Sequence, residues 1–264
     1  MFTPIKVLRP ARTASVLICS IISLFVLLPI VVVIVGSLRT NGELLNAPFS
    51  WPTILHWENY TQILFGGVFW QELWNSFLTM IGTVVVLLVV TCPAAFVLAR
   101  LVFPGRNVVF NVFLLGLLFP ITMAVLPLYI TIRQLSLLNT LWGIILPQVA
   151  FSLPITILIL WNFFRAVPQE LEDAAAIDGA PIMGFFWYIL LPLARPALAV
   201  VTMLAMVASW NNFLLPLLVL NDQSTWTLPL GATQFQGQYS SDWVLVLAFL
   251  TLAMIPAVII YLFA

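Results

Sequence analysis

Long uninterrupted apolar stretches constrain this chain more than any other feature of its sequence. A hydrocarbon core about 30 Å thick needs roughly 20 apolar residues per spanning helix. Six stretches qualify, and they cover residues 14–38, 75–98, 108–131, 141–164, 196–220 and 243–264. With 63% hydrophobic and only 7% charged residues, a soluble domain of 264 residues could not cover its apolar surface. We therefore predict an all-α, polytopic membrane helical bundle of six transmembrane helices, forming one domain over residues 1–264.

The positions of the basic residues predict the orientation of this bundle. If the N-terminus is cytoplasmic, seven of the nine Lys and Arg residues fall on the cytoplasmic side, and only Arg39 and Arg133 fall outside. The seven are Lys6, Arg9, Arg12, Arg100, Arg106, Arg165 and Arg195. Because cytoplasmic loops carry the excess of positive charge, we predict that both termini are cytoplasmic. The formal net charge is zero, which argues against a nucleic-acid partner.

Several classes of mechanism find no support in the residues. Cys19 and Cys92 both lie in apolar runs, so they predict neither a disulfide framework nor a metal site. No ionisable residue lies well inside a predicted span, which disfavours proton coupling. The only lysine is Lys6 and no GxxxxGK[ST] loop is present, so we expect neither ATP binding nor catalytic residues in this chain. A secondary transporter or channel for a small polar solute stays open as an alternative.

The loop over residues 165–195 interrupts the apolar pattern. Four of the nine acidic residues lie there: Glu170, Glu172, Asp173 and Asp178. Pro168 suits the start of a helix and Gly179 suits the left-handed residue that ends one, which predicts a short helix of about ten residues. A second short apolar helix is predicted over residues 182–190, returning along the membrane surface.

The helical spacing of this loop suggests a docking element. Leu171, Ala174, Ala175 and Asp178 stand at i, i+3, i+4 and i+7 and are expected to share one face. Small side chains on that face would allow another surface to approach closely. From the residues alone, a docking element for a cytoplasmic partner and a plain surface connection between two spans are about equally supported.

The same loop resembles the EAA loop of permease subunits in binding-protein-dependent ABC importers. The matching positions are Asp173, Ala174, Ala175, Gly179, Ile189, Leu191 and Pro192. The string LEDAAAIDGA…LPLARPAL is similar to the carbohydrate branch, most closely to the maltose-type second permease subunit. WENYTQIL, NSFLTMIGTVVVLLVVTCPAAFVLARLVFPGR and SWNNFLLPLLVL carry the likeness over nearly the whole chain. Asp173 stands where the family usually has glutamate, which keeps the charge but shortens its reach.

The resemblance implies a permease subunit of an ATP-driven importer of a sugar or sugar-derived solute, working by alternating access. The implied partners are a cytoplasmic ABC ATPase dimer that holds ATP and Mg, a second homologous permease, an external solute-binding protein and the lipid bilayer. The implied location is the prokaryotic cytoplasmic membrane. The residues that would couple to the ATPase are Glu172, Asp173, Ala174, Ala175, Asp178, Gly179, Leu191 and Pro192. A non-transporting scaffold that recruits the ATPase is a further alternative.

Polar residues in and near the spans are the candidates for solute contact. Trp210, Asn211, Asn212, Gln148 and Ser152 could line a sugar pathway, although hydrogen bonding between helices explains membrane-embedded amides more often. In the loop over residues 221–242, similarity suggests contact with the binding protein. The residues expected to make it are Gln234, Gln236, Gln238 and Tyr239. A solvated connection is the alternative for that loop.

Overall fold

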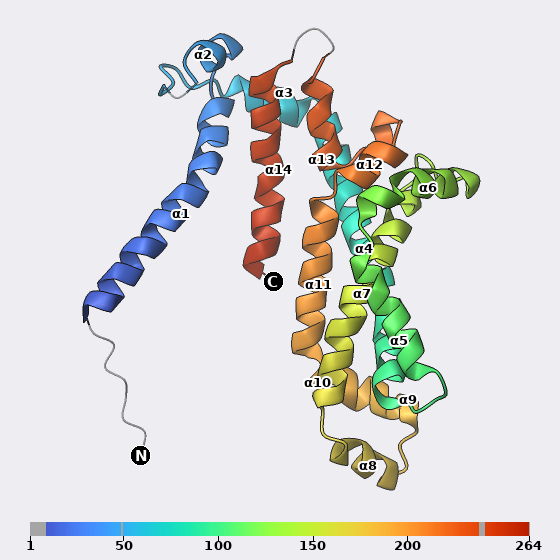
Figure 1. Ribbon diagram of the computed structural model, residues 1–264. Helices are drawn as coiled ribbons and strands as arrows, with labels where there is room; N and C mark the ends of the chain where they lie inside the picture. Colours follow the sequence, from blue (N-terminus) through green and yellow to red (C-terminus); the bar gives the residue numbers. More distant parts are fainter. Residues whose placement is uncertain (1–8, 49, 238–240, 264) are drawn as a thin grey trace. The chain divides into compact units, whose positions relative to one another are not determined.

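The computed structural model describes residues 9–48, 50–237 and 241–263, and these are almost entirely helical (Figure 1). The one element of another kind in the described ranges is an isolated antiparallel bridge between Gln236 and Ser241. The chain divides into two compact units. The first contains residues up to 67 together with 232–256, and the second contains 68–231 together with 257–264.

The first unit is built around two long apolar helices. Its elements are α1 (Arg9–Ser37), α2 (Asn41–Asn46), α3 (Glu58–Phe65), the 3-10 turn η4 (Ala232–Phe235) and α14 (Trp243–Phe263), which belongs to it as far as Pro256. Asn41 joins the start of α2 to α14, because its amide donates to Asp242 Oδ1 at 2.8 Å and its oxygen accepts from Val244 N at 3.2 Å. Gly36 lets α1 approach α14 closely, since a Cβ there would lie 2.6 Å from Leu247 Cδ1.

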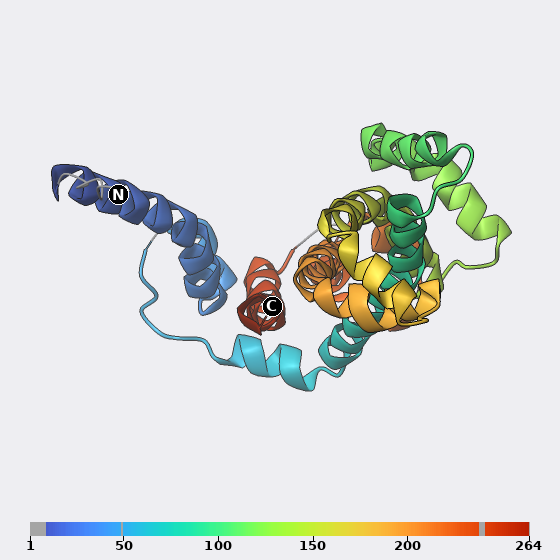
Figure 2. The ribbon, with the colours of Figure 1, turned by 90° about the horizontal axis from the view of Figure 1, so that it is seen from below.

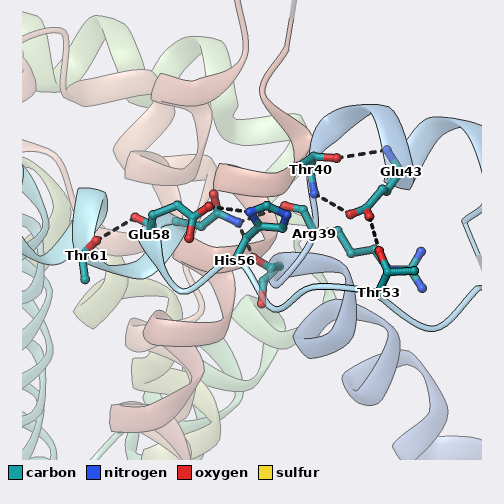
Figure 3. A network of polar contacts seen from close by, with 9 residues as sticks. Arg39, Thr40, Glu43, Thr53, His56, Glu58 and Thr61 are labelled. Carbon is teal, nitrogen blue, oxygen red and sulfur yellow. Dashed lines mark hydrogen bonds and ion pairs between the residues drawn. The ribbon is translucent and has the colours of Figure 1, made fainter.

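The segment between α1 and α3 is held by a polar network (Figure 3). Arg39 is 2% exposed and donates from Nη1 to the carbonyls of Ala47 and Pro48 at 2.9 and 3.0 Å. Thr40 and Glu43 form a reciprocal capping box at the start of α2, and Thr53 donates to Glu43. The hydrogen bond from the Thr40 backbone N–H lowers the pKa of Glu43. His56 pairs with Glu58 and lowers the pKa of that carboxyl.

The second unit is a helical bundle around α4 and α7. Its longer elements are α4 (Val68–Arg100), α5 (Arg106–Leu115), α6 (Ile121–Gln134), α7 (Trp142–Ala166) and α11 (Arg195–Trp210). α4 packs along α7, and α11 packs against both. Their shared core includes Val84, Leu87, Ile145, Val149 and Ala205. A Cβ on Gly82 would lie 2.7 Å from Ile145 Cδ1, so the glycine permits the close approach of α4 to α7.

Shorter elements complete the second unit, most of them at its two ends. They are η1 (Gly116–Leu118), α8 (Glu170–Ile177), α9 (Ile182–Phe185), a π-helical turn (Phe186–Leu190), α10 (Leu191–Leu193), α12 (Leu214–Val219), η3 (Gln223–Thr225) and α13 (Leu228–Gly231). Seen from below, α8 and α9 lie across the ends of the long helices of this unit (Figure 2). α12, η3 and α13 lie at the other end, beside α6 and the start of α4 (Figure 1).

Two of the predicted spans are not continuous helices. The stretch over 108–131 bends by 103° between η1 and α6, where Pro120 stands in an extended conformation and lacks the N–H that would continue the helix. The stretch over 196–220 ends as α11 at Trp210 and restarts as α12 at Leu214. α4 is longer than the predicted 75–98, at 33 residues. Four helices of the described chain are long and apolar enough to cross a membrane. The number rises to six if two bent pairs, residues 106–118 with 121–134 and residues 182–193 with 195–210, each count as one span.

Candidate functional site

The turn after α8 has the geometry that the sequence predicts. α8 contains eight residues, and Gly179 adopts φ +78°. The amide of Ala180 donates to the Ala175 carbonyl at 2.9 Å, which closes the helix with the hydrogen bond typical of a Schellman motif. A Cβ at Gly179 would meet nothing within 4 Å, so glycine is favoured there by its backbone conformation and not by lack of space.

α8 presents two different faces. Ala175 is 6% exposed and belongs to the core cluster that contains Phe96, Phe164 and Phe186. Ile177, in contrast, is 86% exposed. The residues exposed on α8 and its turn are Glu170, Leu171, Asp173, Ala174, Ala176, Ile177, Asp178 and Gly179. The predicted face of Leu171, Ala174, Ala175 and Asp178 therefore lies at the border of the contact with the bundle, with Ala175 buried and the other three exposed.

The segment after α8 packs its apolar residues back onto the same cluster. Phe185, Phe186 and Leu190 are buried, and the rings of Phe186 and Phe96 lie 4.8 Å apart. The predicted helix over 182–190 is present, although its second half is a π-helical turn. Ile189 and Leu191 pack at the edge of the cluster, while Pro192 is exposed. The motif positions of the loop thus divide into residues that attach it to the bundle and residues that remain accessible.

A charged contact that the sequence did not reveal joins α8 to the long helices. Arg100, the last residue of α4, donates from Nη2 to the carbonyl of Val167 at 2.5 Å. Its Nη1 lies 3.4 Å from Oε2 of Glu172, which is half-buried in the first turn of α8. The paired residues stand 72 positions apart, so local spacing gave no signal of the contact.

Gln148 links three helices of the second unit. Its Oε1 accepts hydrogen bonds from Thr83 Oγ1 of α4 at 2.8 Å and from Ser209 Oγ of α11 at 2.7 Å. Gln148 itself stands on α7 and is 6% exposed, and its Nε2 has no hydrogen-bond partner among the described residues. The amide oxygen is therefore used for hydrogen bonding between helices. Ser152, one turn further along α7, is half-buried.

Asn211 and Asn212 stand at the break between α11 and α12. Asn211 caps the end of α11, and its amide donates to the Val207 carbonyl at 2.9 Å. Asn212 Oδ1 accepts from the backbone N–H of Leu215 at 3.1 Å, in the first turn of α12. The Asn212 side chain thus satisfies a backbone N–H that the helix break leaves free, and the Asn211 amide adds a second hydrogen bond to a carbonyl that already accepts from its own N–H. Trp210 is 6% exposed, so little of its ring is available to stack on a solute.

A buried carboxyl at the opposite end of α4 also escaped the sequence analysis. Glu72 is 0% exposed, and both its oxygens lack a hydrogen-bond partner in the described part of the chain. It packs against Gly231, where a Cβ would overlap its carboxylate. Glu72, Ser76, Thr79 and Thr83 stand at i, i+4, i+7 and i+11 and are all buried, which is the spacing that could have indicated a polar stripe on α4.

The segment that carries α13 docks on the same helix through polar contacts. The Asn75 amide donates to the carbonyls of Ser224 and Trp226 at 3.0 and 2.9 Å, and Ser76 Oγ accepts from the backbone N–H of Leu228 at 2.7 Å. Further along, in the first unit, Gln234 is half-buried and Gln236 is exposed. Gln238 and Tyr239, the other two residues expected to contact a binding protein, lie outside the described residues.

Comparison with known proteins identifies the family. Residues 92–264 match the family described as binding-protein-dependent transport system inner membrane component. The diacetylchitobiose uptake system permease protein NgcG of Streptomyces coelicolor is 34% identical over 241 residues, covering 90% of this chain and 80% of that protein. The arabinooligosaccharides transport system permease protein AraQ of Bacillus subtilis is 31% identical over 256 residues, covering 96% of this chain and 90% of that protein.

The fold is also found in a solved structure. A chain of a bacterial ABC transporter involved in the import of the acidic polysaccharide alginate superposes with a TM-score of 0.83 and 22% sequence identity, covering 99% of this chain and 96% of that one. The family match spans well over half of the sequence, and the relatives align along nearly all of it. This chain is therefore a member of the family of inner membrane components of binding-protein-dependent transport systems.

Proposed function

We propose that this chain is the transmembrane permease subunit of an ATP-driven importer of a sugar or sugar-derived solute. The observation that carries the proposal is its similarity, over about nine-tenths of its length, to permease proteins whose names specify diacetylchitobiose and arabinooligosaccharides. Membership of the family makes it a transport subunit and not an enzyme. Neither a P-loop nor a lysine beyond Lys6 occurs in the sequence, so ATP and Mg would be held by a partner ATPase.

The topology we propose has six spans with both termini in the cytoplasm. In this arrangement the bent helices of residues 106–134 form one span, and α11 with α12 after its break forms another. The distribution of basic residues supports the orientation, because Arg100, Arg106, Arg165 and Arg195 all stand at the end of the second unit that carries α8. α8 would then face the cytoplasm of a prokaryotic cell, and α13 would face the outside.

α8 is the proposed site of contact with the cytoplasmic ATPase dimer. Ile177 is an exposed apolar side chain on the side of α8 away from the buried Ala175, and Leu171 is exposed one turn before Ala175. Asp173 and Asp178 add negative charge to the exposed surface. Such a surface suits a cleft with an apolar floor and polar edges. Closure of the ATPase pair on ATP would displace α8 and shift the bundle between inward- and outward-facing states.

The remaining partners and contacts follow from the same proposal. A second homologous permease would complete the translocation pathway, and an external solute-binding protein would deliver the solute to the segment around Gln234 and Gln236. Gln148, Asn211 and Asn212 make hydrogen bonds within this chain. A substrate-pathway role for them would use the atoms that these bonds leave available, such as Gln148 Nε2.

Reconstitution tests the proposal directly. Liposomes would contain this chain with its cognate ATPase and second permease, and the cognate binding protein would be loaded in turn with labelled mono-, di- and oligosaccharides. We expect uptake that requires ATP, binding protein and all membrane components. Uptake by this chain alone without ATP would instead support a secondary transporter or channel, and ATPase recruitment without any uptake would support a scaffold.

A further inference from the structure

Arg100 stands at the end of α4 and contacts both the end of α7 and the start of α8. It is the last residue of α4, and its guanidinium donates to the carbonyl of Val167, which directly follows α7. The same group pairs with Glu172 in the first turn of α8. The Arg100 side chain is 9% exposed and that of Glu172 is 26% exposed. One partly buried cation therefore joins α4, α7 and α8.

Each of these contacts is favourable for a separate physical reason. The last carbonyls of a helix have no partner within the helix and carry negative partial charge, so a cation beside Val167 satisfies the end of α7. A carboxylate is favoured at the positive N-terminal end of α8, where Glu172 stands. The planar guanidinium can donate to both acceptors in a fixed geometry, whereas a lysine ammonium on a flexible chain would not hold the two in one orientation.

We propose that Arg100 is a positioning residue that makes α8 move as one body with the ends of α4 and α7. The inference rests on the proposed function of α8 as the ATPase contact, and it assigns Glu172 to the bundle as the counter-ion of Arg100. Ala175 is the one buried residue of α8, and a single buried methyl leaves the helix able to turn about that point. The second, polar attachment at Glu172 removes this rotation, so that a push on the exposed face is passed on to the long helices.

A distance measurement between α8 and α4 tests this rigidity. Nitroxide labels would be placed at Ala176→Cys on α8, which is exposed and is not among the residues assigned to the ATPase contact, and at Val102→Cys just after α4, which is 93% exposed. The native cysteines would be replaced by Cys19→Ser and Cys92→Ala. Pulsed electron paramagnetic resonance on the complex with its second permease and ATPase, with and without ATP, would then report the distribution of the distance between the labels.

The variant Arg100→Gln removes the charge and is compared with Arg106→Gln as a matched control. Arg106 is a neighbouring arginine that donates to the Leu101 carbonyl of its own loop at 3.2 Å. We expect a narrow distribution that ATP does not shift in the parent and in Arg106→Gln. In Arg100→Gln we expect a broad distribution that shifts when ATP is added, because α8 would then follow the ATPase without α4. Glu172→Gln, which leaves α4 unaltered, should broaden the distribution as well.

A narrow, ATP-independent distribution in both Arg100→Gln and Glu172→Gln would overturn the proposal. Co-purification of the ATPase with the unsubstituted chain is measured separately and tests the function of α8. If no ATPase binds, the proposed function fails, but the width of the distribution without ATP still decides whether Arg100 fixes α8. If the ATPase binds and the distribution stays narrow in these variants, only the role of Arg100 fails. An equally broad distribution in Arg106→Gln would also count against it, since loss of any nearby arginine would then suffice.

Discussion

The hydrogen bonds at Gln148 predict an unusual order of stabilities among variants of one site. Thr83 and Ser209 both donate to Gln148 Oε1, at 2.8 and 2.7 Å, and all three residues are buried. Hydrogen bonds between membrane helices contribute about 0.6 kcal/mol on average and at most about 1.7 kcal/mol. We expect Thr83→Val and Ser209→Ala each to lower the free energy of unfolding by an amount in this range.

The double variant Thr83→Val/Ser209→Ala should cost more than the sum of the single ones. It leaves the Gln148 carbonyl without a donor, and a stranded buried polar group costs about 1–3 kcal/mol more. Gln148→Leu should cost less than the double variant, because it removes the amide altogether and the two hydroxyls can donate to carbonyls one turn back in their own helices. Adding Gln148→Leu to the double variant should therefore restore part of its stability.

Equilibrium unfolding of the purified chain in mixed micelles, followed by tryptophan fluorescence, measures these differences. The reasoning fails if Gln148→Leu is the least stable of the set, or if adding it to the double variant lowers stability further. ATP-driven uptake by the same variants separates a role in packing from a role in the solute pathway. If Gln148→Leu left the stability unchanged but raised the KM for solute uptake, the main role of the amide would be to bind solute and not to join helices.

Three further predictions concern single positions. Because Gly179 has φ +78°, Gly179→Leu should cost about 1–2 kcal/mol in the turn after α8 and reduce ATP-driven uptake without loss of membrane insertion, whereas Gly179→Asn should retain most uptake. Gly231→Ala should lower the unfolding temperature, since the added methyl overlaps the Glu72 carboxylate and such overpacking costs about 1–3 kcal/mol, and Glu72→Ala in the same chain should reverse part of the loss. Because the pKa of Glu43 is lowered from its usual value of 4.5, the hydrogen bond that its carboxylate accepts from the Thr40 N–H stabilises the folded segment fully at pH values above 4.5. That stabilisation is lost as the pH falls through the lowered pKa. Hydrogen exchange at the Thr40 amide should therefore lose protection on acidification, and Glu43→Gln should remove that pH dependence.

The spans could be predicted because their signal is local. A bilayer requires a long apolar run and internally bonded backbone, so 14–38, 141–164 and 243–264 each correspond to a long helix in the structure. The left-handed turn at Gly179 was equally visible, since a glycine followed closely by Pro181 suits that backbone conformation whatever packs around it. These features depend on neighbouring residues in the sequence.

The breaks within the spans were harder to predict. Pro120 bends the chain sharply, while Pro93, Pro147 and Pro154 lie inside helices that continue past them. The same residue type thus has opposite outcomes, because neighbouring helices can satisfy the backbone groups that a proline leaves free. The restart of the helix after Asn212 likewise depends on its side chain reaching the Leu215 amide.

From the residues alone, a polytopic membrane protein and the course of most of its long helices could be predicted, and residues 165–195 resemble an EAA-type loop. How the residues of that loop divide between the bundle and the surface depends on tertiary packing, which places Ala175 in the core and leaves Ile177 exposed. The same packing also decided that Gln148 joins three helices, that Glu72 is buried and that Arg100 meets Glu172. These contacts join positions as far as 72 residues apart, and which side chains meet depends on how the helices rotate and cross when they pack. The spacing of residues along the sequence does not specify how the helices rotate and cross.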